Sequence, residues 1–347
     1  YQSLLSTSLI GIDFHHHDHC AFIKTGWIVW AFELIMKTKL STLDKISLVI
    51  VTLLAIVPFQ GIVYDLFMMK VFCFAIFAAS LNLLLGFAGL LSFGHAAFFG
   101  TGAYITAHVM KEWGLTPEVG LILGVLCSTA LGYVFGALAI RRQGIYFAMI
   151  TLALAQVIYF LATQVPFTNG EDGIQGVPRG KFLGFIDLST STPMYYFALA
   201  VFIAAFFLIK RIVNSPFGQV LKSIRENEPR AISLGYDVNR YKLIAFTLSA
   251  GLAGLGGGLK SLVLQLASLS DVFWHTSGEA VLMTILGGIG TLWGPVAGAA
   301  IIVNLQNYLA NLGGWSTITT GIIFVVCVLA FRRGIVGEIA YRLKIKL

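Results

Sequence analysis

The chain alternates between long apolar runs and short polar connections. Five runs are almost free of charged residues: 46–63, 66–85, 121–140, 145–163 and 243–266. A helix rises about 1.5 Å per residue, so about 20 mostly apolar residues are needed to cross about 30 Å of hydrocarbon. The five runs meet or approach this length, and helices inside soluble proteins rarely carry so little charge. The pattern predicts an all-α, polytopic membrane protein.

Shorter apolar segments between these runs raise the predicted number of membrane helices to ten. One of them, at 280–293, is too short to span alone, and the glycine-rich stretch 287–294 separates it from the next. These two segments could form a broken or re-entrant pair, so the count lies between eight and ten. The predicted helices cover residues 46–64, 66–86, 92–110, 119–140, 145–164, 194–210, 243–267, 280–293, 295–311 and 316–331.

The distribution of Lys and Arg predicts the orientation, because short cytoplasmic loops of membrane proteins carry an excess of both. The loop 210–242 holds seven basic residues, and the turn at 141–142 and the C-terminal tail are also basic. The loops 165–193 and 111–118 carry nearly balanced charge. We therefore expect both termini and the loop 210–242 in the cytoplasm, with the two balanced loops outside.

The first 35 residues differ from the rest of the chain. They contain the cluster His15, His16, His17 and His19, flanked by acidic residues, and a short apolar patch follows. Clustered histidines can bind a metal ion, but an incidental polar tract is the simpler interpretation, and we predict no metal site. We expect residues 1–35 to be an upstream extension and residues 36–347 to form the transmembrane domain.

Composition supports a membrane location, with 57% hydrophobic and 11% charged residues. The formal net charge of +7 raises the question of nucleic-acid binding. However, the basic residues cluster between apolar runs and do not alternate with aromatic residues on a polar domain, which argues against it. Cys73, Cys127 and Cys327 lie inside predicted spans without CxxC spacing, so they indicate packing residues rather than a disulfide or metal site.

Motifs for catalysis or nucleotide binding are absent from the sequence. It contains no GxSxG, no HExxH and no pair of carboxylates on one predicted helix face. It also lacks GxxxxGK[ST], the loop whose backbone amides hold nucleotide phosphates. We predict that the chain is not an enzyme and does not bind ATP itself.

Small residues recur at helical spacing. Gly132 and Gly136, and likewise Gly294 and Gly298, have GxxxG spacing, and residues 251–258 are rich in glycine. In lipid, small residues let helix backbones approach closely. Tight helix packing is the favoured interpretation, ahead of a direct role in contacting a substrate.

Several polar residues fall within or beside the predicted spans. Ionisable groups at membrane depth are costly and are often functional. Lys260 could line a path through the protein or extend towards the outer interface, and side-chain amides could line such a path or bridge helices. The candidates for a substrate path are Asn82, Ser92, His95, Gln156 and Lys260.

The predicted cytoplasmic loop contains signals for two short helices. Ser215 and Pro216 form a helix start, with Ser as the cap and Pro in the first position, and an amphipathic helix extends to about Glu226. Pro229 should start a second helix that ends at Gly235. A charged helix pair of this kind is either a docking surface for a soluble partner or a solvated connector. Its apolar contact residues would be Ala231, Ile232 and Leu234.

Five ordered sequence blocks, within a match from about residue 48 to 337, resemble the branched-chain amino acid permeases of ABC importers. The resemblance is to the larger of the two permease subunits. The blocks are Asn82 to Gly100 (NLLLGFAGLLSFGHAAFFG), 173–178 (GIQGVP), 215–235, 240–243 (RYKL) and 286–295 (LGGIGTLWGP).

The resemblance implies a transmembrane permease domain in a bacterial inner membrane, working by alternating access. It implies a second permease subunit, two cytoplasmic ATP-binding subunits that carry ATP and Mg²⁺, and a periplasmic substrate-binding protein. Ala231 and Gly235 match the family's EAAxxxG coupling pattern, whereas Pro229 and Arg230 depart from it. The expected coupling residues are Ser215, Pro216, Arg225, Glu226, Glu228, Arg230, Ala231 and Gly235.

Two alternatives differ in substrate or in energy source. Permeases for urea or short amides resemble the same blocks, and the neighbouring genes would distinguish them. A secondary transporter driven by an ion gradient also uses broken helices, but it would work without ATPase partners. The scarcity of charged residues in the spans argues against this second alternative.

Overall fold

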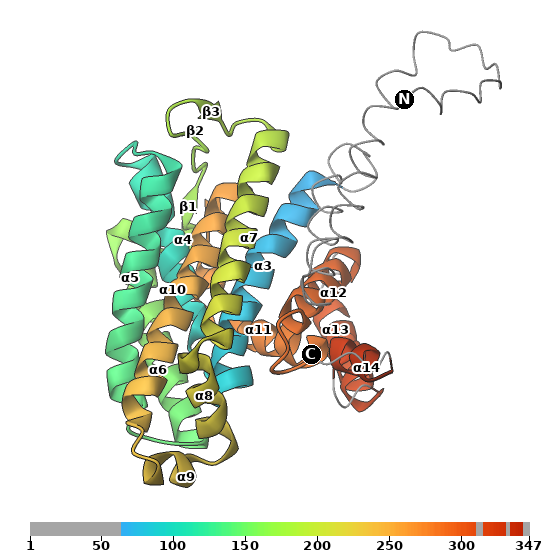
Figure 1. Cartoon of the computed structure of the whole chain (residues 1–347). Helices are drawn as coiled ribbons and strands as arrows, with labels where there is room; N and C mark the ends of the chain where they lie inside the picture. Colours follow the sequence, from blue (N-terminus) through green and yellow to red (C-terminus); the bar gives the residue numbers. More distant parts are fainter. Residues whose placement is uncertain (1–63, 310–314, 331–333, 343–347) are drawn as a thin grey trace, which may run out of the picture. The chain divides into compact units, whose positions relative to one another are not determined.

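The computed structural model describes residues 64–309, 315–330 and 334–342, all within one compact unit of the chain (Figure 1). The described part is almost entirely helical, which confirms the predicted all-α class. All but the last residue of the expected helix at 46–64, and residues 1–35 with their histidine cluster, lie outside the described residues.

Among the described residues, five helices are long and apolar enough to cross a membrane, which confirms a multi-pass protein. The first consists of α3 (Asp65–Asn82) and a π-helical end, η1 (Leu83–Ala88), and it is buried along most of its length. Three of the others expose much more of their surface, as lipid-facing helices do. They are α5 (Pro117–Ala139), α6 (Ile145–Gln164) and α7 (Ser191–Asn214). The fifth, α10 (Val238–Leu264), is largely buried within the bundle.

Four further helices within the described part are shorter than a full span. They are α4 (His95–Lys111), α11 (Trp274–Gly287), α12 (Gly294–Leu309) and α13 (Trp315–Ala330), and a final helix, α14 (Ile335–Arg342), was not predicted. The predicted glycine-rich break is confirmed, because it separates α11 from α12. The short helices explain why the sequence left the number of spans open.

Two helix starts differ from the prediction for identifiable reasons. α10 begins at Val238 rather than 243, because the Asp237 side chain caps it by accepting a 3.3 Å hydrogen bond from the Arg240 amide. α11 begins at Trp274 rather than 280, because its first turns are polar and carry no hydrophobic signal. In both helices the first residues are largely polar, so the hydrophobic pattern alone does not show where the helix begins.

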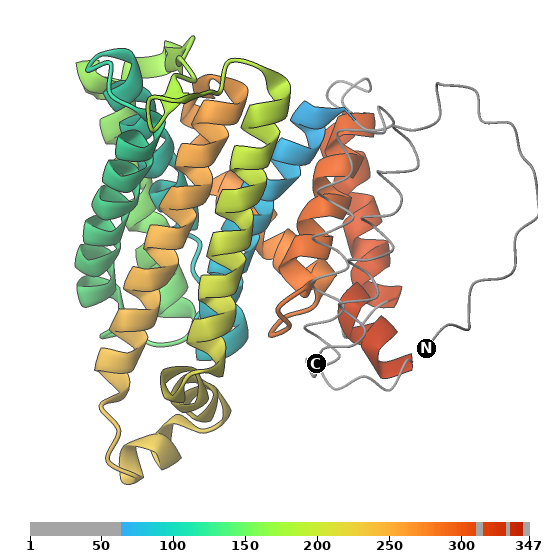
Figure 2. The ribbon, with the colours of Figure 1, turned by 45° about the horizontal axis from the view of Figure 1, so that its top comes forward.

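α10 packs against α3, α4 and α5, and it runs beside α5 through the bundle (Figure 2). Glycine makes this packing possible: a Cβ on Gly257 would collide with the Phe99 carbonyl, and one on Gly132 would collide with Ala250. Gly298 of α12 meets the Met283 carbonyl of α11 in the same way. These contacts confirm that the small residues serve close helix packing.

The connection between α6 and α7 contains two 3₁₀ turns and three short strands. The turns are η2 (Pro166–Thr168) and η3 (Gly170–Asp172), and β2 (Lys181–Phe182) pairs with β3 (Ile186–Asp187). The strand β1 (Ile174–Gln175) pairs antiparallel with β4 (Leu266–Ala267), which directly follows α10. The GIQGVP block is therefore fastened to the end of α10.

The helix α7 extends from one end of the bundle to the other. It starts after the β2–β3 connection and leads directly into α8 (Pro216–Glu226) and α9 (Glu228–Ser233). Its 24 residues correspond to about 36 Å, more than the hydrocarbon thickness. Figure 1 shows α8 and α9 at the opposite end from β2 and β3. The loops 165–193 and 210–242, which were predicted on opposite sides of the membrane, thus lie at opposite ends of the bundle. Which of the two ends faces the cytoplasm stays a prediction.

Candidate functional site

The helix pair α8–α9 is shaped by the local signals read from the sequence. The Ser215 hydroxyl caps α8 by accepting from the Gly218 amide at 3.3 Å, and the Asn227 side chain caps α9 by accepting from the Arg230 amide at 3.0 Å. Gly235 ends the pair with φ +87°, a conformation that favours glycine. The predicted start and stop of the pair are therefore confirmed.

A small apolar core holds this pair to α10. Ile224, Ala231 and Val238 form a buried cluster. Ala231 was expected among the exposed contact residues, but it is only 1% exposed, so its role in the structure is to pack against α8 and α10. Ile232 and Leu234 are 58% and 66% exposed, and they form the apolar face that remains open.

Glu228 fastens α9 to two other elements. Its carboxylate forms an ion pair with the Lys242 ammonium of α10 at 2.8 Å and accepts a 2.9 Å hydrogen bond from the Gln143 amide in the α5–α6 turn. The Lys242 side chain is only 6% exposed, so the pair is sheltered from water. Glu226 and Arg230 are exposed, as is Pro216 at the start of α8. The structure thus shows Glu228 in contacts within the chain and the other three groups exposed, while the coupling role of all four stays a prediction.

Arg225 links α8 to the end of the first long helix. Its guanidinium donates a hydrogen bond to the Gly86 carbonyl in η1, where the last carbonyls of a helix lack partners of their own. The chain then turns at Gly89, with φ +72°, and a Cβ there would lie 3.1 Å from the Arg225 side chain. Lys222 lies 5.6 Å from the centre of the Phe87 ring. α8 is thus tied directly to a helix break.

A second glycine-rich break, at 86–94 between η1 and α4, lies against the break at 287–294. The Asn82 side chain donates to the Thr291 carbonyl at 2.9 Å and accepts from the Gly290 amide at 2.9 Å. A Cβ on Gly86 would collide with the Asn82 side chain and lie 2.7 Å from the Gly290 nitrogen. Asn82 therefore bridges two segments of the chain, as side-chain amides were expected to do, and its role in a substrate path stays a prediction. Arg225, Asn82 and both breaks form one connected group, which we call the break cluster.

His95 and Ser92 are both buried and hydrogen-bonded within the bundle. His95 Nε2 lies 2.8 Å from the Ser249 hydroxyl, which donates to the Ser80 carbonyl at 2.5 Å. The Ser92 hydroxyl accepts from the Gly94 amide at 3.3 Å. The His95 contacts join α3, α4 and α10. These residues stabilise the start of α4, and their role in a substrate path stays a prediction.

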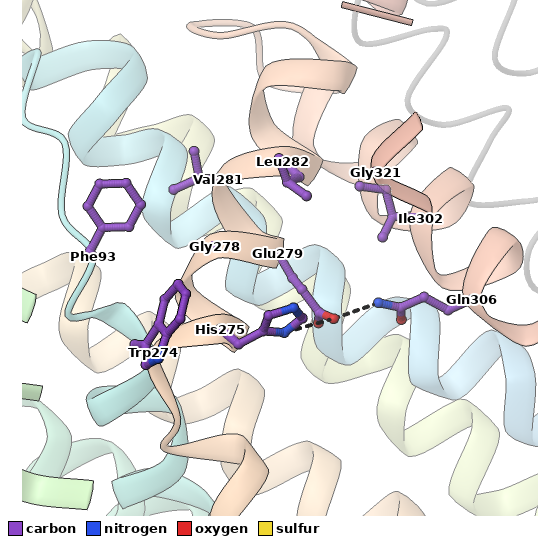
Figure 3. A pocket seen from close by; sticks show the side chains of 10 residues that line it. All are labelled: Phe93, Trp274, His275, Gly278, Glu279, Val281, Leu282, Ile302, Gln306 and Gly321. Atoms are coloured by element: carbon purple, nitrogen blue, oxygen red, sulfur yellow. Dashed lines mark hydrogen bonds and ion pairs between the residues drawn. The ribbon is translucent and has the colours of Figure 1, made fainter. Parts of the chain in front are cut away.

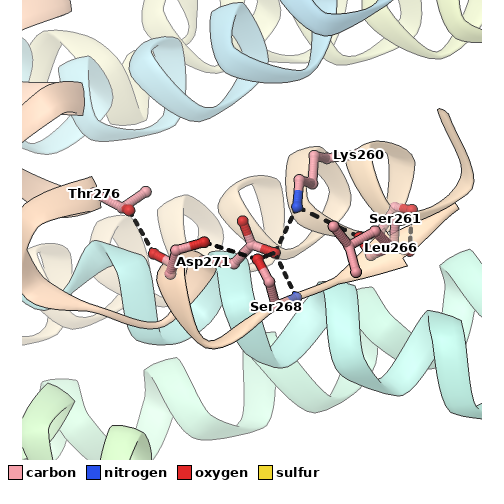
Figure 4. A network of polar contacts seen from close by, with 8 residues as sticks. Lys260, Ser261, Leu266, Ser268, Asp271 and Thr276 are labelled. Atoms are coloured by element: carbon pink, nitrogen blue, oxygen red, sulfur yellow. Dashed lines mark hydrogen bonds and ion pairs between the residues drawn. The ribbon is translucent and has the colours of Figure 1, made fainter. Parts of the chain in front are cut away.

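Lys260 forms a buried ion pair (Figure 4). Its ammonium lies 2.7 Å from the Asp271 carboxylate, and each side chain is 7% exposed. The Ser268 amide donates to the same carboxylate at 3.0 Å, and Lys260 also approaches the Leu266 carbonyl at 3.4 Å. The Lys260 ammonium thus has a carboxylate partner inside the protein, and its role in a substrate path stays a prediction. In contrast, the Gln156 amide nitrogen is buried without a hydrogen-bond partner among the described residues.

Sequence reasoning did not select Asp271, although a signal was present. Asp271 and Glu279 are the only acidic residues between 238 and 287. A carboxylate in such an apolar stretch calls for a partner, because an unpaired charge is costly at membrane depth. Lys260 lies eleven residues away in the sequence, and the turn η4 (Leu269–Asp271) brings the two together.

Packed helices that break at glycine-rich turns, polar bridges between the breaks and a capped helix pair at one end define a membrane protein built like a transporter. Over residues 63–331 the sequence matches the family described as "Branched-chain amino acid transport system / permease component", and the chain belongs to this family. This confirms the resemblance seen in the sequence blocks. No solved structure matches the chain.

Similar proteins include amino-acid and sugar permeases. The high-affinity branched-chain amino acid transport system permease protein LivM of Salmonella typhimurium is 27% identical over 297 residues, covering 79% of this chain and 70% of the relative. LivM of Escherichia coli is 26% identical over 296 residues, with the same coverage. The ribose import permease protein RbsC of Bacillus subtilis is 27% identical over 242 residues, covering 63% of this chain and 70% of that protein.

Proposed function

We propose that this chain is the permease subunit of an ATP-driven importer that moves branched-chain or closely related amino acids into the cytoplasm. The observation that carries the proposal is the family match over 63–331. The two LivM proteins named above cover 79% of this chain, against 63% for the ribose permease of Bacillus subtilis, which favours an amino acid over a sugar.

The proposed complex contains a second permease, two ATP-binding subunits and a periplasmic substrate-binding protein. ATP and Mg²⁺ would bind the ATP-binding subunits, because this sequence contains no phosphate-binding loop. The exposed face of α8–α9, with Ile232 and Leu234, would receive one of them. Specificity would reside mainly in the substrate-binding protein.

The proposed mechanism is alternating access driven through the break cluster. Closure of the ATP-binding subunits would shift α8–α9, whose own core and caps keep it rigid. Arg225 would pass this shift to Gly86, and Asn82 would pass it to the turn between α11 and α12. Glycine-rich breaks can absorb backbone rotation at low cost, so they are suited to act as hinges.

Co-purification from the native host tests the proposed assembly. The tagged chain, extracted in mild detergent, is expected to bring along a second permease and a pair of ATP-binding subunits. Recovery of the chain without an ATPase, combined with uptake that follows an ion gradient, would support the secondary-transporter alternative instead.

Leu234→Asp should weaken docking of the ATP-binding subunit. The substitution places a charge on the exposed apolar face, and loss of about 2 kcal/mol from an interface corresponds to about a thirtyfold weaker complex. We expect the co-purified ATPase to fall strongly while the permease stays in the membrane. Leu183→Asp is a matched control, because Leu183 is 62% exposed in the connection at the opposite end. Equal ATPase recovery from Leu234→Asp and wild type would contradict docking on this face.

A further inference from the structure

A cavity of about 660 Å³ lies between α11 and the helices α12 and α13 (Figure 3). Pockets that bind small molecules typically measure about 300–1,000 Å³ and have mainly apolar walls. Here Val281, Leu282 and Ile302 supply aliphatic surface, and Phe93 and Trp274 supply aromatic surface. The cavity thus has the size and lining suited to a small molecule with an apolar part.

One wall of this cavity carries a carboxylate. Glu279 is the only Asp, Glu, Lys or Arg in α11, and its side chain is 20% exposed. The Gln306 amide donates to it at 2.7 Å, and His275 Nδ1 lies 3.6 Å away (Figure 3). Lys70 of α3 interacts with it electrostatically without lining the cavity. A carboxylate has about four acceptor positions, so Glu279 retains capacity for another donor.

The cavity borders elements that the proposed mechanism would move. Phe93 belongs to the glycine-rich break before α4, and the other lining residues lie on α11, α12 and α13. The Ser277 hydroxyl of α11 accepts from the Ala96 amide at the start of α4 at 2.7 Å, which joins the beginnings of two short helices. Transporter binding sites are typically formed beside such discontinuous helices.

We propose that this cavity is a transient subsite for an amino acid in transit, with Glu279 binding its ammonium group and Val281, Leu282 and Ile302 contacting its aliphatic side chain. This inference rests on the proposed function. An ammonium group offers three donors to the carboxylate, and Gln306 holds that carboxylate in place. A neutral sugar has neither the cation nor the aliphatic chain, so the lining favours an amino acid over ribose.

Glu279→Gln tests the subsite in the assembled transporter in proteoliposomes with saturating binding protein. The variant keeps the shape but loses the charge, so leucine uptake should fall at least about tenfold, the factor that corresponds to one charge-assisted hydrogen bond. ATP hydrolysis should stay within about twofold of wild type. Glu338→Gln, the same change on α14, should import normally. Uptake by Glu279→Gln within twofold of wild type would overturn the subsite. Loss of the second permease from the Glu279→Gln complex would also overturn it, because the cavity would then be a subunit interface.

Chemical labelling gives a readout at Glu279 itself. Dicyclohexylcarbodiimide modifies carboxylic acids in apolar surroundings, and mass spectrometry can follow its reaction with Glu279. Leucine should slow this labelling, whereas the keto acid of leucine, which lacks the ammonium group, should not. Equal labelling with and without leucine, in preparations whose wild-type protein imports leucine, would overturn only the subsite. If the wild type imports none of leucine, isoleucine and valine, the proposed function is overturned instead.

Discussion

Replacing Arg225 with Met is expected to abolish most uptake while the transporter still assembles and hydrolyses ATP. The substitution removes the hydrogen bond from α8 to the Gly86 carbonyl, the direct link between the helix pair and the break cluster. Hydrogen bonds from charged groups contribute about 1.5–3 kcal/mol, so a loss of tenfold or more in uptake is expected. Parallel measurements of leucine uptake and ATP hydrolysis in proteoliposomes would reveal the uncoupling.

Two controls separate transmission from other effects of removing Arg225. Arg225→Lys keeps the charge but loses the planar guanidinium, so it should recover only part of the uptake. Arg240→Met removes a charge whose ion pair with Asp237 is largely exposed, with 82% and 54% of the two side chains accessible, and it should leave uptake nearly unchanged. Normal uptake by Arg225→Met would contradict the proposed link. A parallel fall in ATP hydrolysis would assign Arg225 to docking instead.

The second large effect is expected at the buried ion pair between Lys260 and Asp271. Lys260→Met leaves the carboxylate buried without its cation, and breaking a buried pair typically costs about 3–5 kcal/mol. The purified permease should therefore unfold at a clearly lower temperature, and less of it should reach the membrane. Thermal unfolding in detergent, followed by fluorescence, measures this change.

The double variant Lys260→Met/Asp271→Leu distinguishes charge from packing. Removing both charges eliminates the uncompensated carboxylate, so much of the lost stability should return. Arg342→Met serves as a surface control, because Arg342 is 76% exposed in its pair with Glu338. If the double variant is no more stable than Lys260→Met, the ion pair is not the cause of the loss. If it is stable but does not transport, the pair has a role in the transport cycle.

Features encoded locally could be predicted from the sequence. The span 145–164 agrees with α6 because it is one uninterrupted apolar run. The start of α8 was predicted because Ser215 and Pro216 act on their immediate neighbours. The family was identified from blocks such as GIQGVP, whose glycines adopt positive φ at Gly173 and Gly176.

Features that depend on distant partners could not be predicted. Ala231 is buried because Ile224 and Val238 cover it, and a six-residue helix has too short a pattern to show which face turns inward. The contact of Asn82 with Gly290 joins residues 208 positions apart. The sequence contains glycine-rich stretches at 86–94 and 287–294, but nothing in it shows that they touch. The polar first turns of α11 hid both its start and Glu279.

ATP-dependent uptake by the reconstituted complex tests the central claim most directly. The chain, its second permease and the ATP-binding subunits would be placed in liposomes that enclose ATP. The binding protein and labelled leucine, isoleucine or valine would be added outside. We predict accumulation that requires both ATP and the binding protein and persists when ionophores collapse the ion gradients. Accumulation that follows an ion gradient without ATP, or import of urea or ribose but not of leucine, would contradict it.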